Sequence, residues 1–549
     1  MSASSKKKLR KELNAAKMTE RQLAEQKEAK KLKLLTISFV AVLALILVVA
    51  IAFTAVKYFT NANVQAKNTV AVTIGDNKLN SVELNYYYID YAYEYANTYG
   101  AYASMFGLDF TKALSAQVVN EETGATWADE FITGAIQNAK SVYAVCAEAE
   151  AQGYTLSQET TDEIKASMED IKLSAQMQQM DVDSFIQAYY GPGATLESYT
   201  EYQMMRALSQ EYIAYYTESL NYEEADLRAA EEGKEAEYNN YSYNYYYVNS
   251  SKFLTGGTTD EEGNTTYSEE EKAAALSAAE EAAKALAAGE YASVEDFDAA
   301  IAAMEINAEA ETPAKSTAFE NYAYSNVFNT VKEWVTDASR KTGDVDYVEY
   351  VSVTTNDDGT ETKTVNGYYV VYFVEREDNN FPLANVRHIL VKPEGGTVDS
   401  STGMTVYTEE ELAAAKSEAE ILLKKWQDGE ATEKSFAALA TEYTDDPGSQ
   451  ETGGLYTDVY PGQMVTTFND WCFADGRKAK DTGIVETDYG YHIMYYSGDS
   501  EIIYRDYLIE GSLVNADTEA WYNALVEAMT VTEGDTKYIL RDLVMSPSY

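Results

Sequence analysis

The stretches "NVRHILVK" (385–392) and "YGYHIMYY" (489–496) contain the two histidines of this 549-residue chain, His388 and His492. Both stretches are short apolar runs of the kind that form buried β-strands. The chain has no other histidine. The placement leaves two interpretations: the rings act together in one site, or both are satisfied residues of a core.

An internal repeat surrounds the two stretches. The segment 267–289 matches the segment 407–429 without a gap, and each begins with a sequence typical of a helix capping box. Around these segments the same elements recur in the same order: a strand, a long helix, a short helix, a tryptophan-bearing helix and a strand. The repeat predicts two tandem α+β domains, at 241–378 and 382–499.

The two copies differ at the histidine positions. Tyr245 and Tyr369 of the first copy align with His388 and His492 of the second. A histidine retained only for packing is not expected to be confined to one copy and to both key positions in it. The difference favours a functional site in the second copy. It also favours a catalytically silent first copy, whose tyrosines suggest a binding or spacer module.

The N-terminal part of the chain predicts a membrane anchor. Residues 34–56 form an uncharged run, and about 20 apolar residues suffice to span a bilayer. Residues 1–33 carry eleven Lys or Arg and four Glu, so the positive-inside rule places this leader in the cytoplasm. We therefore expect a single-pass protein with most of its chain outside the cytoplasm. The alternative is a secretory signal peptide, for which both the apolar run and the leader are too long.

The remainder of the chain is strongly acidic, because the formal net charge is −48 although the leader is basic. An acidic surface argues against nucleic-acid binding, which needs basic patches. After a short linker at 57–68, periodicity predicts a mainly helical region at 69–240, with Gly100 as a helix C-cap. Residues 500–549 predict an amphipathic helix and a final strand at 536–544. Whether this segment packs on the 69–240 region stays open.

Five motifs give the second copy a resemblance to the parvulin family of peptidyl-prolyl isomerases. They stand in the family's order: "VRHILV" (386–391), "FAALATEYTDD" (436–446), "GGLY" (453–456), "PGQMVTTF" (461–468) and "TDYGYHI" (487–493). The wider layout resembles the exported foldases of the PrsA and SurA families. The resemblance implies an α+β multidomain protein with a helical chaperone-like region, a degenerate first parvulin-like domain and an active second one.

The resemblance also implies the residues of a site. Its polar wall comprises His388, His492, Asp446, Thr444 and Thr487. In this implied arrangement the histidines form a hydrogen-bonded pair between neighbouring central strands, and the threonine hydroxyls bond to their rings. The apolar pocket for the proline ring comprises Leu455, Met464 and Phe468. Asp446 also begins an Asp-Pro-Gly sequence, which is ordinary turn chemistry, so a purely structural role for it stays open.

Two departures from the family pattern bear on activity and specificity. The usual "GGDLG" is shortened here to "GGLY". The loop after the first strand has no basic cluster, so a phosphate would find no partner and we expect no phosphopeptide specificity. Turning an X-Pro bond breaks no covalent bond, so the expected reaction uses no metal and no cofactor. The spacing of the histidines does not indicate a metal site either.

Together these features predict a membrane-anchored foldase outside the cytoplasm. An acidic ectodomain behind one anchor suits a cell with one membrane and a wall, as in Gram-positive bacteria. The protein would bind newly exported, unfolded polypeptides and accelerate isomerisation of their X-Pro bonds with the 382–499 domain. The alternative is a non-catalytic membrane-anchored chaperone or scaffold whose two parvulin-like folds only present surfaces.

Overall fold

The chain divides into two compact units. The computed structural model describes residues 62–261, 263–356, 359–398 and 405–545. One unit comprises residues 1–220 together with 516–549, and the other comprises 221–515.

The predicted leader (1–33) and membrane segment (34–56) lie outside the described residues. Within the ranges that the structure describes, no helix combines the length and the apolar character needed to cross a bilayer.

The first unit is mainly helical, with one three-stranded sheet. Its principal helices are α2 (Ser81–Tyr99), α3 (Trp127–Ala151), α4 (Gln158–Met177), α5 (Val182–Tyr190) and α6 (Leu196–Ser219). The sheet has the order β17-β1-β2, from β1 (Val70–Ile74), β2 (Asn77–Asn80) and β17 (Val531–Glu533). A short hairpin joins β3 (Val118–Asn120) to β4 (Ala125–Thr126).

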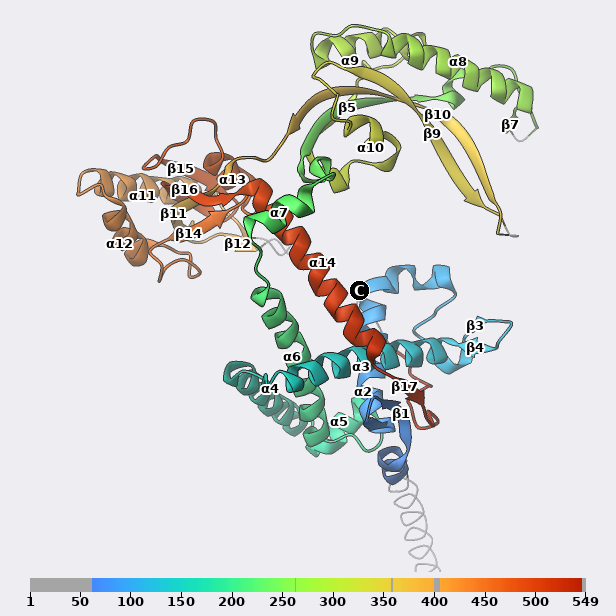
Figure 1. Ribbon diagram of the computed structural model, residues 1–549, viewed down its shortest axis with the longest axis vertical. Coiled ribbons are helices and arrows are strands. Elements are labelled where there is room, and N and C mark those ends of the chain that lie inside the picture. Colours follow the sequence, from blue (N-terminus) through green and yellow to red (C-terminus); the bar gives the residue numbers. More distant parts are fainter. Residues whose placement is uncertain (1–61, 262, 357–358, 399–404, 546–549) are drawn as a thin grey trace, which may run out of the picture. The chain divides into compact units, whose positions relative to one another are not determined.

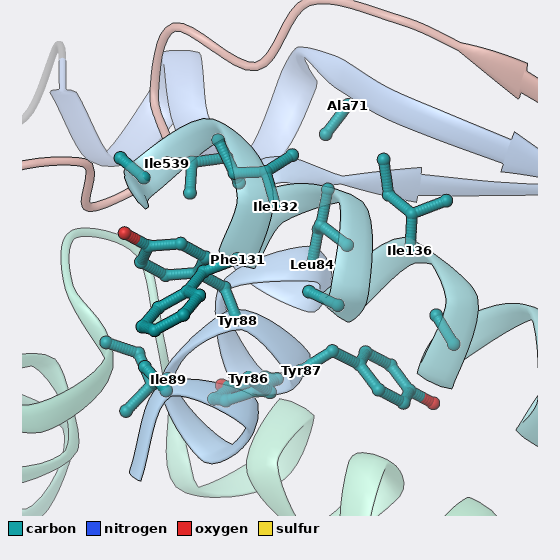
Figure 2. Close-up of a cluster of buried hydrophobic side chains, with 14 of the residues drawn as sticks. Ala71, Leu84, Tyr86, Tyr87, Tyr88, Ile89, Phe131, Ile132, Ile136 and Ile539 are labelled. Carbon is teal, nitrogen blue, oxygen red and sulfur yellow. The ribbon is translucent and has the colours of Figure 1, made fainter. Parts of the chain in front are cut away.

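Tyrosines of α2 form the centre of this unit. Tyr86, Tyr87 and Tyr88 are all buried, although consecutive helical residues point in different directions. Helix α2 is therefore covered on several sides. Phe131 and its neighbours from α3 pack on it (Figure 2). The ring of Tyr202 from α6 stacks on Tyr86, with the ring centroids 5.1 Å apart. Aromatic rings bury a large apolar area each, which explains how so tyrosine-rich a segment makes a core.

The C-terminal segment contributes to the same core. Strand β17 pairs antiparallel with β1, and Ile539 is buried among residues of α2 and α3 (Figure 2). The strand predicted at 536–544 is wrong, because these residues form turns and the strand lies earlier in the chain. The Asn85 side chain accepts a hydrogen bond from the Leu540 backbone N–H at 3.0 Å. This backbone group thus bonds to a side chain instead of to a neighbouring strand.

One further prediction for this unit is wrong. The prediction placed residues 62–68 in a linker, but they are helical. The helix places Ala66 in the hydrophobic core of the unit, and this contact favours it. Gly100 is the C-cap of α2, as predicted, but its φ of −55° is right-handed, and the chain continues as the 3₁₀-helix η1 (Gly100–Phe106). The left-handed stop is Gly107, with a φ of 72°.

The helical region is also shorter than predicted, since residues 221–240 belong to the second unit. Helix α7 (Glu224–Glu231) is tied there by two ion pairs, Arg228 with Asp506 and Glu231 with Arg505. Both partners lie at the start of α14 (Tyr504–Ala528), and the boundary between the units falls inside that helix.

The second unit contains two four-stranded sheets with equivalent strand orders. The first, β8-β5-β10-β9, consists of β5 (Asn240–Asn249), β8 (Thr317–Ala323), β9 (Val345–Thr355) and β10 (Glu361–Glu377). The second, β14-β11-β16-β15, consists of β11 (Pro382–Val391), β14 (Leu455–Val459), β15 (Thr482–Thr487) and β16 (Gly490–Ile503). In each sheet, the first and last strands in sequence are the central pair. Side hairpins pair β6 (Thr258–Thr259) with β7 (Thr265–Thr266) and β12 (Thr397–Val398) with β13 (Thr405–Val406).

Helices cover both faces of each sheet. On the first sheet, α8 (Glu269–Ala287) and α9 (Val294–Ala302) pack on one face and α10 (Asn329–Val335) on the other (Figure 1). On the second sheet, α11 (Glu409–Gln427) and α12 (Glu433–Tyr443) pack on one face and α13 (Thr466–Cys472) on the other. Each sheet thus has two apolar cores, and the α13 side of the second sheet carries both histidines.

The shortened "GGLY" loop brings β14 against β11. Gly454 has a φ of +75°, its carbonyl accepts a hydrogen bond from the His388 N–H at 2.9 Å, and its N–H donates to the Ser449 carbonyl. A Cβ atom on Gly454 would lie 2.2 Å from the His388 carbonyl oxygen. Only glycine allows both this left-handed conformation and this close approach.

We expect Gly454→Ala to destabilise the second sheet by about 2 kcal/mol or more, through backbone strain and the clash with β11. The measurement is amide hydrogen exchange of β11 and β14, followed by mass spectrometry on the whole chain. Gly511→Ala is the control, because Gly511 lies in α14 with no heavy atom near its Cβ position. Exchange in β11 as slow as in the wild type would show that the loop geometry is not required.

Candidate active site

The two histidines meet on neighbouring central strands. In the antiparallel register of β11 and β16, His388 lies opposite Met494 and His492 lies opposite Leu390. The two residues are therefore diagonal neighbours on one face of the sheet. Their Nδ1 atoms are 3.0 Å apart, and the side chains are almost fully buried, with exposed fractions of 2% and 6%.

The remaining ring nitrogens also have partners. The Nε2 of His492 lies 2.9 Å from the Thr487 hydroxyl. The Nε2 of His388 lies 3.0 Å from Oδ2 of Asp446 and 3.1 Å from the Ser449 hydroxyl. All four ring nitrogens are thus engaged within the protein, which leaves none free to bind a metal. In the part of the chain that the structure describes, no group of three or more His, Cys, Asp or Glu side chains could hold a metal ion.

The site contains neutral imidazoles beside an ionised carboxyl group. Burial lowers the pKa of His388 and lowers that of His492 to about 3, where the neighbouring His388 adds to the effect. Burial alone would raise the pKa of Asp446, but hydrogen bonds from Ser449 and Tyr456, together with His388, lower it to about 2. At neutral pH the wall therefore carries one negative charge and no positive one.

These charge states fix the direction of the hydrogen-bond chain. An ionised carboxylate only accepts, so the proton of His388 must sit on Nε2 and point to Asp446. The Nδ1 of His388 is then an acceptor, and the Nδ1–H of His492 donates to it. The Nε2 of His492 is left to accept from the Thr487 hydroxyl. The chain runs from Thr487 through both rings to Asp446.

Asp446 combines the two roles considered from sequence. Its Oδ1 accepts a hydrogen bond from the Gly448 N–H at 3.1 Å, as an aspartate in a turn does. Its Oδ2 faces His388 and Tyr456, and the Tyr456 hydroxyl donates to it at 2.8 Å. The turn orients the carboxylate, and the second oxygen belongs to the site.

The placement of Thr444 differs from the expectation that its hydroxyl bonds to a histidine ring. The hydroxyl oxygen accepts hydrogen bonds from the backbone N–H groups of Leu390 at 3.1 Å and of Asp446 at 3.2 Å. Thr444 therefore attaches the loop that carries Asp446 to the end of β11. Thr487 makes the expected contact with a ring.

A hollow of about 410 Å³ opens beside the histidine pair. Its lining includes Met464, Val465, Phe468, Tyr456 and Tyr489. The Phe468 ring stands edge-on to both imidazoles, with centroid distances of 5.6 and 5.4 Å. A concave, mostly apolar hollow with a few convergent polar groups is the usual form of a binding site.

One residue of the pocket expected from the resemblance is replaced by its neighbour. Leu455 lies opposite Arg387 in the β14–β11 register, whereas Tyr456 lies opposite Val386 and lines the hollow. Successive strand residues point to opposite faces, so only one of the two can reach the site. Met464 and Phe468 do line the hollow, as expected.

Sequence reasoning missed Ser449 and Tyr456. Ser449 is fully buried and lies three residues after Asp446, within the turn that begins there. No periodic signal marks a residue in such a loop. Tyr456 belongs to the "GGLY" motif, but strand alternation shows only that Leu455 and Tyr456 point to opposite faces, and the choice between them depends on the β14–β11 register.

The first sheet has the same register but different chemistry. Tyr245 lies opposite Val371, and Tyr369 lies opposite Tyr247, which reproduces the arrangement around the histidines. The Tyr245 and Tyr369 rings are 5.2 Å apart and nearly perpendicular, and both pack on Phe328. An aromatic cluster thus occupies the place of the imidazole chain.

One family match falls on the domain that contains the second sheet. The Rotamase family, described as a PPIC-type PPIase domain, matches residues 388–498. Foldase protein PrsA 3 of Bacillus anthracis is 32% identical over 127 residues, which cover 23% of this chain and 35% of the relative. Chaperone SurA of Pseudomonas fluorescens is 27% identical over 153 residues, covering 27% of this chain and 32% of the relative.

A crystal structure of a peptidylprolyl isomerase (PrsA) from Bacillus cereus shares 25% sequence identity. It covers 27% of this chain and 49% of that chain, with a TM-score of 0.18. The chain spans about a third of the length of the curated relatives that it matches. The Rotamase match at 388–498 confirms the resemblance to parvulin-type isomerases that was predicted from five short motifs. The PrsA and SurA relatives confirm the resemblance to these foldases that was predicted from the wider layout.

Proposed function

We propose that this protein is a foldase that binds unfolded polypeptides and accelerates cis–trans isomerisation of their X-Pro bonds. The observation that carries the proposal is the apolar hollow beside the hydrogen-bonded pair His388–His492, within residues that match a PPIC-type PPIase domain. The relatives named foldase and chaperone support a role on unfolded chains.

The barrier to be lowered is rotation about an amide bond. It amounts to ~18–20 kcal/mol, and the uncatalysed reaction of an X-Pro bond takes tens to hundreds of seconds. The planar amide is stabilised by charge separation between its oxygen and nitrogen, and this resonance is lost in the twisted transition state. A site that grips the proline ring and excludes water disfavours the planar form relative to the twisted one.

The residues of the hollow suit these tasks. Met464 and Phe468 offer an apolar slot for the proline ring. The Asp446 carboxylate, at the edge of that slot, would repel the partially negative carbonyl oxygen of the planar amide and so favour twisting. Four donors already bond to this carboxylate, so we assign it an electrostatic role and no covalent attack.

The domain organisation is also part of the proposal. We infer that 241–378 and 382–499 are tandem parvulin-like domains, the first without isomerase activity because tyrosines replace both histidines. The equivalent strand orders of their sheets support this inference. The first domain would serve as a binding or spacer module.

The helical unit suits a client-holding role. Helix η1 exposes a group of large apolar side chains: Tyr102, Met105 and Phe106 are 60%, 79% and 58% exposed. Methionine and aromatic surfaces adapt to varied partners, which is what a chaperone for unfolded chains requires.

We further propose that residues 34–56 anchor the protein in the cell membrane and that the acidic body lies outside the cytoplasm. The uncharged run and the basic leader before it support this topology. A Gram-positive cell suits it. The clients would be newly exported polypeptides. Phosphopeptide specificity is not expected, because the loop after β11 lacks a basic cluster.

His388→Ala and His492→Ala are each expected to lower kcat/KM for a proline-containing tetrapeptide by at least about tenfold, because either change breaks the chain that ends at Asp446. Tyr369→Phe, at the equivalent position of the first sheet, is expected to have wild-type activity. An inactive wild-type chain would instead support the non-catalytic scaffold. Wild-type activity in both histidine variants would contradict the proposed site.

The pH dependence follows from the lowered pKa values of both histidines and of Asp446. Each of these pKa values lies below the ordinary value of its group, which is about 6.5 for histidine, so kcat/KM should be flat between about pH 7 and 8. Below about pH 6.5 the unfolded chain binds protons that the folded site does not, so stability falls as the pH drops. An activity step near pH 6.5 would show that a histidine titrates in the folded enzyme.

The client-holding surface can be tested by replacing Met105 and Phe106 together with serine. Because each buried apolar side chain contributes about 1.5–3 kcal/mol, affinity for an unfolded, aggregation-prone test protein should fall by about tenfold or more. Leu173→Ser with Met177→Ser on α4 is the control, since these residues are similarly exposed, at 55% and 77%. Equal effects of both pairs would contradict a specific role for η1.

A further inference from the structure

Tyr456 occupies a position between the apolar and polar parts of the site. It lies on β14 opposite Val386, and its ring lies nearly parallel to the His388 ring, at 5.0 Å and 17°. The same ring lines the hollow together with Met464 and Phe468. An aliphatic residue could supply this wall equally well, so the phenol hydroxyl needs a separate explanation.

The hydroxyl is directed at the charged group of the site. It donates a hydrogen bond of 2.8 Å to Oδ2 of Asp446, the oxygen that also faces His388. Burial, followed by the hydrogen bond to Asp446, raises the pKa of Tyr456 to about 12, so the phenol keeps its proton and remains a donor. A hydroxyl has one proton, and this one is used on Asp446.

The Asp446 carboxylate depends on such donors because it lies at an edge of the site. Its side chain is 18% exposed, so water can reach it. Besides His388, the side-chain donors to Oδ2 are Ser449 and Tyr456. Ser449 belongs to the same turn as Asp446, three residues further along the chain. Tyr456 comes from a sheet strand and can fix the turn relative to the sheet.

We propose that Tyr456 is a positioning residue, whose hydroxyl holds the Asp446 carboxylate ionised and directed at His388 while its ring forms a wall of the proline pocket. This inference rests on the proposed isomerase function and deepens it. Without the hydroxyl, the carboxylate would lose the one side-chain hydrogen bond that links it to β14. The pocket wall would remain, because phenylalanine has the same ring.

The test compares Tyr456→Phe with the wild-type chain, using a proline-containing tetrapeptide over a range of substrate concentrations and pH. We expect kcat to fall by about tenfold with KM nearly unchanged, because a transition-state interaction is lost while the pocket is retained. We also expect the acidic limb of the pH profile to move to higher pH, since loss of a donor raises the pKa of Asp446.

Tyr460→Phe is the control, because this phenol lies just beyond the same strand and stacks on Tyr507 outside the hollow. Carboxyl ¹³C NMR of Asp446 gives a readout that does not depend on activity, and its titration should shift upward in Tyr456→Phe alone.

Four outcomes are distinguishable. An inactive wild-type chain would overturn the proposed function itself. An active wild type, with a Tyr456→Phe variant of equal kcat and equal acidic limb, would overturn the inference even if the variant were less heat-stable. An unshifted Asp446 titration in that variant would overturn it as well. A lower kcat together with the upward shift would support it.

Discussion

The contact between the His388 and His492 rings depends on the register of two strands. Because the residues of a strand alternate between faces, a slip of β11 against β16 by one residue would place one ring on the α11 side and abolish the pair. The register is fixed by burial on both faces of the sheet, with Phe436 on one side and Phe468 on the other. The 3.0 Å contact between the rings is thus a consequence of packing across the whole domain.

Burial explains the chemistry of the site as well as its geometry. It keeps both imidazoles neutral, so their hydrogen-bond chain has one direction and ends on a carboxylate. The carboxylate remains charged because hydrogen bonds from Ser449 and Tyr456 compensate for its own burial. One fixed negative charge beside an apolar hollow is an environment that disfavours a charge-separated amide, which is what isomerisation of an X-Pro bond requires.

The two sheets of the second unit have the same strand order but different side chains at the equivalent positions. Their strand orders and central registers correspond, and each is covered by helices on both faces. The first sheet nevertheless fills the equivalent place with Tyr245, Tyr369 and Phe328, which pack edge to face and need no charge. The fold therefore supplies a position for two side chains, and the identity of those side chains decides whether the position can do chemistry.

The sequence by itself determined the periodic elements, and the resemblance of its motifs to the parvulin family implied the pairing of the histidines. The repeat, the strand-like runs and the motif order sufficed for the helices and the central strand pair of each sheet, since these patterns reflect local periodicity, but the outer strands β8, β9, β14 and β15 were not predicted. The patterns did not suffice where an element is stabilised by contacts with residues that are distant in the sequence. The tail strand lies at Val531–Glu533 because β1 provides an edge there, and residues 62–68 are helical because Ala66 has a core to enter.

Only the tertiary structure decided which residues surround the histidine pair. The choice of Tyr456 over Leu455 depends on the register of β14, which a pair of left-handed glycines sets against the backbone of His388. Ser449 reaches the site because its turn folds onto β11, where its hydroxyl meets the His388 ring. The Thr444 hydroxyl bonds to the backbone N–H of Leu390 and so attaches the same segment to β11. These choices follow from contacts between residues far apart in sequence, and no local pattern encodes them.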